Sequence, residues 1–489
     1  MNDHRAHWKR SREIVERVVV KGDLVLLTPT HLGSGDAEGP TDMSLLLDPL
    51  TRTQALLTGA SIAGALRNYL REREYGYQVS LPPEQERHST VGLLFGGQRG
   101  DPEGEQSALI VDDARSQTAD IELRDGVRID PKTRTAMVEE EHGRKRGYKF
   151  DVELLQAGTR FPLRFELLIP RGKNQALKAA LAQALQGLER GEISLGARKR
   201  RGFGQCQVEK WDVVCYDLTT INGLLAWLKS DESGAAEGPH IADLLEVQIE
   251  EDDQRSYFKI QATFRLEGSM LIRSGFGESD TGPDIVHLHS YRMDQGRVPV
   301  LPGTSLAGVI RHRALRVANT LAPKGKGQVL VNGMFGRSPT KGDDTLTASR
   351  VVVQETAIEG TRSLVQSQIK IDRFTGGAFA TALFAEQPVF GGPDSKVKVE
   401  LSLRKPEPHE IGLLLLVLKD LWTSDLPVGG ETSVGRGRLA GVEAKLQLQG
   451  SDTGRQWTLK QSDDRLEVTG DDKELLEEYV QALLKEVQG

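Results

Sequence analysis

Alternating apolar and polar residues predict strands at corresponding places along the chain. Residues 18–27 and 257–266 alternate in this way and are rich in β-branched and aromatic side chains. We expect them to be the opening strands of two similar units. Residues 161–168 repeat the pattern and are expected to pair in the same sheet as the first of them.

Helical spacing occurs between the predicted strands. Ser61 and Ser305 stand where a helix N-cap is expected, each in a segment of small and apolar residues. Two further helices are predicted. The first is indicated by the spacing of Leu177, Leu181, Leu185 and Leu188, and its counterpart in the second half is expected over Glu410 to Trp422. The predicted class is therefore α+β, with sheets backed by helices and long inserted loops, as in ferredoxin-like or RNA-recognition domains.

The chain contains an internal repeat. Leu57 to Arg67 returns as Leu301 to Arg311, with Gly, Ser, Ala, Gly and Arg in register. Further pairs follow in the same order: Gly33 to Asp42 with Gly275 to Asp284, Leu94 to Gly96 with Met334 to Gly336, Arg128 to Thr133 with Lys370 to Thr375, and Gly196 to Gly204 with Gly429 to Gly437. We therefore expect two tandem domains of one fold.

Polar and small residues suggest where these domains meet. We expect a basic N-terminal extension over residues 1–17, a first domain over 18–229, a linker over 230–250 and a second domain over 251–489. The second domain is expected to end in an acidic helix. A length of 489 residues also exceeds what one hydrophobic core usually serves.

Composition narrows the class of protein further. Two cysteines are too few for a disulfide framework, and no apolar run is long enough to span a membrane, so the expected location is the cytoplasm. A net charge of −7 argues against a protein that coats nucleic acid over its whole surface. Basic residues instead gather in glycine-flanked runs, which predicts basic loops on an acidic body.

The glycine-rich loop that closes each half is the first candidate site. Glycines let backbone N–H groups converge on an anion, and flanking arginines can bind phosphate oxygens. The alternative is a turn with solvated charges, but recurrence in both halves favours phosphate binding. The candidates are Arg198, Lys199, Arg200, Arg201, Gly202 and Gly204 in the first half, and Gly435, Arg436, Gly437 and Arg438 in the second.

The start of the repeated helix is the second candidate site. A helix N-terminus presents unpaired N–H groups to which a phosphate can bind. A capped helix with a tightly packed face of small residues is the structural alternative, and the two roles are compatible. The candidates are Gly59, Ser61 and Arg67 in the first half and Gly303, Ser305 and Arg311 in the second.

Asp42 and Asp284 occupy equivalent places in a Gly/Pro loop and are the third candidate site. Near RNA, such a carboxylate can position a 2′-hydroxyl, act as its general base or hold Mg²⁺. Most loop aspartates only cap turns, and Asp36, Asp48, Asp280 and Asp294 are nearby competitors. His287 and His289 are expected to have packing or surface roles. His31 has Arg273 at the corresponding place, which argues against a duplicated histidine mechanism.

These motifs together resemble the repeat-associated mysterious protein (RAMP) superfamily, and within it the backbone subunit of type III CRISPR effector complexes. The resemblance is carried by Thr30 to Gly33, Gly39 to Asp42 followed by Asp48, the helix-start segment, Ile129–Asp130, the closing loop, and Ile371 to Ala378 in the second half. It covers about residues 18–210 and 257–445. The chain thus resembles a fusion of two such subunits, as found in type III-D variant systems.

The resemblance implies a protein that binds guide RNA and complementary target RNA beside other subunits of the complex. Each half would carry a thumb-like hairpin, over residues 128–150 and 370–390, with Arg134 and Arg373 among its RNA-binding residues. Asp42, with Mg²⁺, would support cleavage of the target, whereas the match at Asp284 is weaker. The alternatives are a scaffold that only binds RNA and a metal-independent guide-processing endonuclease that uses His31.

Overall fold

The computed structural model of the chain divides into two compact units, which we describe separately. Unit 1 comprises Met1–Glu122, Glu153–Lys199 and Phe203–Arg255, and unit 2 comprises Leu123–Val152, Arg200–Gly202 and Ser256–Gly489. Two segments from the first half of the sequence therefore belong to unit 2. The structure describes residues 13–35, 42–98, 101, 104–127, 129–130, 133, 136–141, 144–147, 149–249, 252–274, 282–322, 325–337, 346–450, 454–462 and 465–488.

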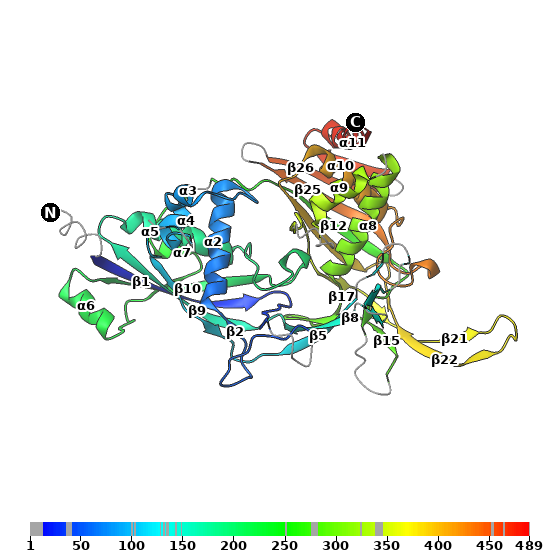
Figure 1. Cartoon of the computed structure of the whole chain (residues 1–489), viewed down its shortest axis with the longest axis horizontal. Helices are drawn as coiled ribbons and strands as arrows, with labels where there is room; N and C mark the ends of the chain where they lie inside the picture. The colour runs from blue at the N-terminus through cyan, green and yellow to red at the C-terminus, as the bar shows by residue number, and fades with distance from the viewer. Residues whose placement is uncertain are drawn as a thin grey trace. The chain divides into compact units, whose positions relative to one another are not determined.

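The core of unit 1 is an antiparallel sheet with two helices on one face (Figure 1). Its strand order is β11-β10-β1-β9-β3, so the first strand lies at the centre between the third and the last of the ferredoxin-like plan. Val20 marks the register, because it lies opposite Phe165 on one side and Val213 on the other. The elements are β1 (Ile14–Leu26), α2 (Gly59–Tyr75), β3 (Leu109–Val111), β9 (Arg160–Pro170), α5 (Asn174–Glu189), β10 (Cys206–Asp217) and β11 (Ala236–Gly238).

Alternation along the strands explains which face is covered. Val18, Val20 and Phe165 point to the side where Leu66 of α2 and Leu181 of α5 complete a buried cluster. The shorter elements of unit 1 are β2 (Leu56–Leu57), α3 (Pro83–Arg87), α4 (Thr90–Phe95), β4 (Ala114–Arg115), α6 (Ile221–Leu228) and α7 (Ile241–Leu244). The short helix η1 (Lys199–Arg201) begins in unit 1 and ends in unit 2. Both β11 and α7 lie within residues 230–250, whose role as a linker stays a prediction.

Unit 2 repeats this plan on a larger sheet. The order β25-β12-β24, with β18 and β19 on the far side of β24, matches β10-β1-β9-β3 strand for strand. Helices α8 and α10 cover the sheet through a core that includes Phe258, Ile310 and Leu414. These elements are β12 (Tyr257–Glu267), α8 (Gly303–Leu321), α9 (Lys326–Phe335), β18 (Val351–Val353), β19 (Thr356–Glu359), β24 (Lys396–Arg404), α10 (Pro408–Trp422) and β25 (Arg438–Gln449).

Several elements extend unit 2 beyond the shared plan. Figure 1 shows β21 and β22 as a long hairpin that projects from the rest of this unit. The predicted acidic C-terminal helix is present as α11, packed on α10. The additional elements are β5 (Ile121–Val127), β6 (Val138–Glu141), β7 (Arg144–Gly147), β8 (Lys149–Leu155), β13 (Ser269–Met270), β14 (Arg273–Ser274), β15 (Ile285–His287), β16 (His289–Arg292), β17 (Gly296–Leu301), β20 (Arg362–Ser363), β21 (Gln366–Ile371), β22 (Ala378–Gln387), β23 (Val389–Phe390), η2 (Thr432–Val434), β26 (Gly454–Ser462), β27 (Arg465–Gly470) and α11 (Glu474–Gln488).

The structure confirms the predicted fold class of two tandem ferredoxin-like domains and corrects one local detail. Helix α2 begins at Gly59 with Thr58 as its N-cap, and α8 begins at Gly303 after Pro302. The prediction that Ser61 and Ser305 are N-caps was therefore wrong, since both lie inside the first turn. Within the described parts of the chain, every helix is too short or too polar to cross a membrane.

Candidate nucleic-acid interface

The closing loop of unit 1 is held by its own backbone hydrogen bonds. Ala197 N donates to the carbonyl oxygen of His31 at 2.9 Å, and Gly204 N donates to that of Pro29 at 3.1 Å. Leu195 N in turn donates to Gly204 O at 2.8 Å. These N–H groups are thus committed to the chain that follows β1. Arginine side chains, more than the backbone, remain to bind an anion here.

The closing loop of unit 2 makes the same three bonds. Gly430 N donates to Leu271 O at 2.8 Å, Gly437 N to Ser269 O at 2.7 Å, and Val428 N to Gly437 O at 2.8 Å. Equivalent residues even share left-handed backbone angles, since φ is 54° at Arg198 in unit 1 and 56° at Glu431 here. The repeat inferred from sequence therefore extends to individual hydrogen bonds.

Close backbone packing explains one of the repeated glycines. Gly437 has a φ of 78°, and a Cβ atom added to it would overlap the carbonyl oxygen of Val428. Gly435 in the same loop has a φ of 89° but nothing within 4 Å of an added Cβ. We expect Gly435→Ala to cost about 1–2 kcal/mol of stability through backbone strain alone.

We expect Gly437→Ala to cost clearly more than Gly435→Ala, because it adds a steric overlap to the same strain. Urea unfolding of the two variants measures the difference. Equal losses would contradict the close-packing role assigned to Gly437.

Three arginines of unit 2 lie close enough to act on one another's charge, and we call them the arginine cluster (Arg200, Arg201 and Arg311). Arg201 donates to the carbonyl oxygens of Arg200 and Val351, both at 3.0 Å. Burial, together with the positive charges of Arg311 and Arg200, lowers the pKa of Arg201 to about 10. When a guanidinium lies beside other positive charges, a bound anion stabilises its charged form.

The arginine cluster joins two sequence motifs from different halves of the chain. Arg200 donates to the carbonyl oxygen of Ser349, and the backbone oxygen of Arg201 lies against Gly303, where a Cβ atom would overlap it. Arg311 follows on α8 and donates to the neutral Asn332 Oδ1 at 2.9 Å. Gly202 is packed equally closely against the backbone of Glu355. The predicted closing-loop and helix-start residues thus meet inside unit 2.

The start of α2 in unit 1 is already capped by protein groups. Gly59 N donates to Asp113 Oδ1 at 2.7 Å, and Ser61 N donates to Thr58 Oγ1 at 3.3 Å. Arg67 pairs with the buried Glu86, which Arg71 also contacts. Burial opposes ionisation of Glu86, but hydrogen bonds from Arg71 and Arg67 lower its pKa overall. The structural reading of this motif therefore has direct support in unit 1.

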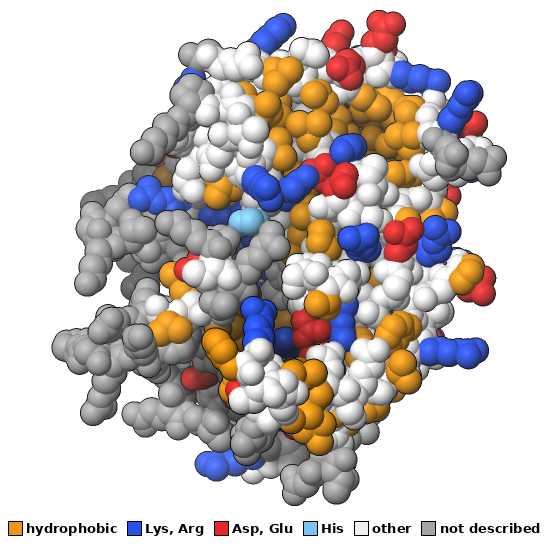
Figure 2. Space-filling model, turned by 90° about the vertical axis from the view of Figure 1, so that its right-hand side faces the viewer, with side chains coloured by type: hydrophobic (Ala, Val, Ile, Leu, Met, Phe, Trp, Pro, Cys, Tyr) orange, Lys and Arg blue, Asp and Glu red, His pale blue; other side chains and the backbone are white. Residues whose placement is uncertain are grey.

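The remaining predicted RNA-binding residues are scattered. Arg198 lies 3.7 Å from Met43 Sδ, and burial lowers its pKa. Arg436 is only 5% exposed and pairs with carboxylates. Ser305 is half-buried, whereas Lys199, Arg373 and Arg438 are exposed. Arg134 lies outside the described residues. Figure 2 shows the same mixture on the face that it draws, where Lys and Arg side chains are scattered among Asp and Glu.

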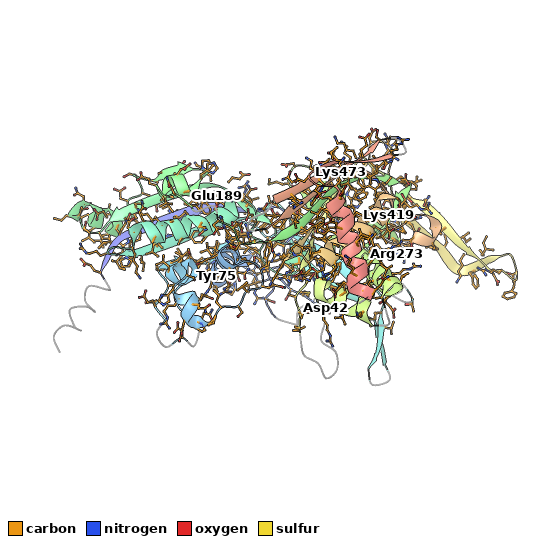
Figure 3. All side chains as sticks on the ribbon, turned by 90° about the horizontal axis from the view of Figure 1, so that it is seen from above. Asp42, Tyr75, Glu189, Arg273, Lys419 and Lys473 are labelled. Atoms are coloured by element: carbon orange, nitrogen blue, oxygen red, sulfur yellow. The ribbon has the colours of Figure 1, made fainter. Side chains whose placement is uncertain are left out.

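Strand register confirms that Asp42 and Asp284 are equivalent. In unit 1 Gly33 forms a β-bridge with Leu45, and in unit 2 Arg273 pairs with His287 in the same way. Asp42 lies three residues before Leu45, and Asp284 lies three residues before His287. Both carboxylates are exposed, and Figure 3 labels Asp42. The Oδ2 atom of Asp284 accepts the N–H of Ala385 at 2.7 Å.

Asp48, a competitor for the catalytic role, is a structural group. Its side chain is buried, with Oδ2 accepting Thr51 N at 3.0 Å and Oδ1 lying 3.1 Å from Arg115 Nε. The backbone hydrogen bond from Thr51 lowers the pKa of this carboxyl. Asp48 thus closes a turn, and its lowered pKa keeps the carboxylate ionised at physiological pH.

Register also corrects the counterpart assigned to His31. Thr30 bridges Leu155 and Met270 pairs with Val389, so the residue equivalent to His31 is Leu271 and the assignment of Arg273 was wrong. His31 is buried with Nδ1 2.8 Å from Glu153 O. The absence of a histidine at Leu271 still argues against a duplicated histidine mechanism.

His287 has the packing role that its sequence context predicts. It is 1% exposed, and its ring nitrogens lie 3.2 Å from Met270 O and 3.1 Å from Val300 O. Burial, with the nearby His289, lowers its pKa to about 4. The imidazole therefore stays neutral at physiological pH. With its Nδ1 accepting Ile272 N at 3.2 Å and its Nε2 donating to Val300 O, it joins these two backbone segments.

A preformed metal centre is not found in the described part of the chain, since no three His, Cys, Asp or Glu side chains come together there. Mg²⁺ is usually bound by one or two carboxylates together with substrate phosphates and waters. Asp42 can offer one such carboxylate. The donor set therefore suits a Mg²⁺ ion that arrives with RNA, and not one held by protein ligands alone.

Sequence reasoning missed two features of unit 2. Arg124 of β5 and Arg292 of β16 both pair with Glu355, whose side chain is fully buried. The tip of the β21–β22 hairpin presents Phe374, which is 98% exposed on a turn closed by Asp372. Arg124 and Arg292 lie far from Glu355 in the sequence, so no local sequence pattern predicts these ion pairs. An isolated apolar residue in a Gly-flanked turn was the available signal for Phe374.

Two ferredoxin-like units with one loop geometry make this a duplicated α+β protein with a basic site in its second unit. The model of the RAMP superfamily matches residues 23–207 and 263–440, one match for each half. The chain therefore belongs to the RAMP superfamily, whose members are generally CRISPR-associated RNA-binding proteins. No curated protein matches the chain closely enough to count as a relative.

Proposed function

We propose that this protein is the guide-RNA-binding backbone subunit of a type III CRISPR ribonucleoprotein. In this role it binds guide RNA, pairs it with complementary target RNA beside other subunits, and cleaves the target. Membership of the RAMP superfamily supports RNA binding. Because base pairing supplies the sequence specificity, the protein needs only to hold the backbone of the RNA.

The arginine cluster is the observation that carries this proposal. Arg201 is largely buried with carbonyl oxygens as its hydrogen-bond partners, and Arg200 and Arg311 add like charge beside it. Such a group repels cations and attracts phosphate.

Cleavage is proposed to occur by attack of a 2′-hydroxyl on the adjacent phosphorus. The new 2′-O–P bond forms a cyclic phosphate as the bond to the 5′-oxygen breaks, and that oxygen leaves with a proton. Asp42 would accept the proton of the 2′-hydroxyl, and its exposed carboxylate in a loop is placed for contact with a strand on the surface. In the alternative, Asp42 would hold Mg²⁺ instead of taking the proton itself, and the bound ion would supply charge stabilisation at the phosphate.

Neutralising the arginine cluster tests the binding proposal. For Arg200→Gln/Arg201→Gln we expect weaker RNA binding and a smaller salt dependence. For single-stranded RNA, the slope of log K against log salt should fall by about 1.4 when two phosphate contacts are lost. Filter binding over a range of salt concentrations measures this slope.

Arg362→Gln/Arg465→Gln is the matched control, because both arginines are exposed on strands of unit 2 and the net charge change is identical. Thermal unfolding followed by circular dichroism shows whether the variants are folded. Equal slopes for the two double variants would rule out the arginine cluster as the phosphate site.

A scaffold that only binds RNA is favoured in unit 2 by one observation. Asp284 already accepts a backbone hydrogen bond from Ala385, which is the role of a turn-capping aspartate. Incubation of the assembled complex with matched RNA and Mg²⁺ separates the two functions, because a scaffold leaves the RNA intact. The histidine-dependent nuclease is disfavoured, since His31 is buried against Glu153 O.

A further inference from the structure

Four charged side chains form a continuous chain in unit 2, which we call the relay (Arg273, Glu431, Arg436 and Glu386). Arg273 Nη2 lies 2.9 Å from Glu431 Oε1, and Arg436 Nε lies 3.2 Å from Glu431 Oε2. Arg436 Nη2 then lies 3.1 Å from Glu386 Oε2. The relay joins β14, the closing loop and β22 with alternating charges.

Burial falls steadily from one end of the relay to the other. Glu386 is fully buried and Arg436 is 5% exposed, whereas the side chain of Glu431 is 19% exposed and that of Arg273 is 58% exposed. Only the guanidinium of Arg273 is therefore well placed to meet a ligand from solution. Figure 3 labels Arg273, on the short strand β14.

The fold itself does not require the relay. The closing loop of unit 1 has the same backbone path, but Arg198 stands in place of Glu431 and the buried Phe203 in place of Arg436. Gly33 stands in place of Arg273, which corrects the pairing of Gly33 with Gly275 expected from sequence. Apolar packing thus suffices at this position, and buried ionic groups are often no more stabilising than such packing. Stability alone therefore does not explain why these four charged side chains stand in unit 2.

The protonation of Glu386 sets the net charge of the relay. Burial and the neighbouring Glu431 raise the pKa of Glu386 above its ordinary value, although Arg436 and Arg273 oppose the shift. Burial also disfavours ionisation of Glu431, but hydrogen bonds from Glu386 and Arg273 lower its pKa overall. With Glu386 protonated, two guanidinium groups face one carboxylate, which leaves one positive charge.

Two neutral amides contact the relay, and the exposed carboxylate of Asp284 lies near it. Gln368 of β21 donates to Glu386 Oε2 at 2.9 Å, and Gln366 accepts from Arg436, and both amides are neutral. Ile285 of β15 lies opposite Glu386. Asp284, which precedes Ile285 in the sequence, accepts a hydrogen bond from Ala385 N. His287, opposite Arg273, is neutral near physiological pH.

We propose that Arg273 binds a phosphate group of RNA and that Glu431, Arg436 and Glu386 position its guanidinium. The second repeat would then carry an arginine contact that the first repeat lacks at Gly33. The inference rests on the proposed RNA-binding function. Glu431 acts as a positioning residue, because its carboxylate pairs with both Arg273 and Arg436.

RNA binding by the full chain, measured against salt, tests the role of Arg273. For Arg273→Gln we expect the slope of log K against log salt to fall by about 0.7 for single-stranded RNA, as for one lost phosphate contact. Arg265→Gln is the matched control, since Arg265 has a similar exposure of 47% and pairs with Glu267 in the same unit. Its slope should stay closer to wild type.

Two further variants distinguish positioning from simple charge. Removing the acid Glu431 with Glu431→Gln would strengthen RNA binding on electrostatic grounds alone, but we expect weaker binding because Arg273 loses its anchor. For wild type, affinity should decline as pH rises through the raised pKa of Glu386. In Glu386→Gln the uncharged amide should remove that decline.

The outcomes separate this inference from the proposed function. If wild type binds no RNA, the proposed function fails first. If wild type binds RNA but Arg273→Gln behaves as Arg265→Gln does, or Glu431→Gln binds more tightly, the inference alone is overturned. Arg273→Lys, which keeps the charge, should recover part of the slope, and circular dichroism verifies that each variant is folded.

Discussion

Replacing Asp42 with alanine is expected to abolish one of the cuts in a matched target RNA while RNA affinity stays close to wild type. Loss of a positioned general base typically slows a reaction by about 10²–10⁴-fold. Affinity should change little, because phosphate contacts from arginines supply most of it. Single-turnover cleavage with Mg²⁺, resolved by position on a sequencing gel, measures the rate at each site.

Two variants calibrate this experiment. Asp120→Ala removes another exposed aspartate of unit 1 and should leave every cut at its wild-type rate. Asp284→Ala tests the equivalent position in unit 2, where we expect the smaller effect because the family resemblance is weaker at Asp284. A complex with Asp42→Ala that still cuts at every position would eliminate the catalytic assignment.

The family resemblance already ranks Asp42 above Asp284, and the structure adds a contact of Asp284 that the sequence does not show. Spacing alone made the two aspartates equivalent, and the strand register supports that equivalence. The bond from Ala385 N arises only because β22 pairs with β15, so a residue about a hundred positions away decides what Asp284 contacts. No local pattern carries that information.

The fold was more predictable than the site because it depends on repeated local patterns. Alternation at Val18 and Val20 and helical spacing at Leu181 and Leu185 identified elements whose apolar faces form one core. The internal repeat then fixed the number of domains. Helix ends were less certain, since Thr58 and Ser61 are both good capping residues and only the chain path selects Thr58.

The candidate site was predicted only in part because a charge has a different role once it is buried. Sequence treats Arg201 and Arg436 alike, as arginines in matching glycine-rich loops. In the structure Arg201 meets carbonyl oxygens beside other arginines, whereas Arg436 lies between Glu386 and Glu431. The glycines of these loops likewise serve close backbone contact, as at Gly437, more than an open phosphate cradle.

Replacing Glu355 with leucine is expected to have the largest effect on stability. Glu355 is fully buried and neutralises both Arg124 and Arg292, so its loss leaves two guanidinium groups without their carboxylate. Removing one partner from a buried ion pair typically costs about 3–5 kcal/mol. Urea unfolding of Glu355→Leu should show that loss, because Arg124 ties residues 123–152 to the rest of unit 2.

Glu359→Leu is the control for this experiment, since Glu359 is 40% exposed and pairs with Lys398 at 3.4 Å. An exposed pair contributes about 0–1 kcal/mol, so this variant should unfold almost as wild type does. Losses within about 1 kcal/mol of each other would show that the Glu355 pairs do not hold unit 2 together.

The pH dependence of unfolding provides an independent test of the same pairs. Burial opposes ionisation of Glu355, but Arg124 and Arg292 lower its pKa below the ordinary value of 4.5. A carboxyl with a lowered folded pKa contributes stability that is complete above 4.5 and is lost as the pH falls through the folded pKa. Wild type should therefore lose stability in acid more steeply than Glu355→Leu does, because the variant lacks the titrating group. Parallel curves would mean that the carboxylate of Glu355 contributes no net stabilisation beyond its packing.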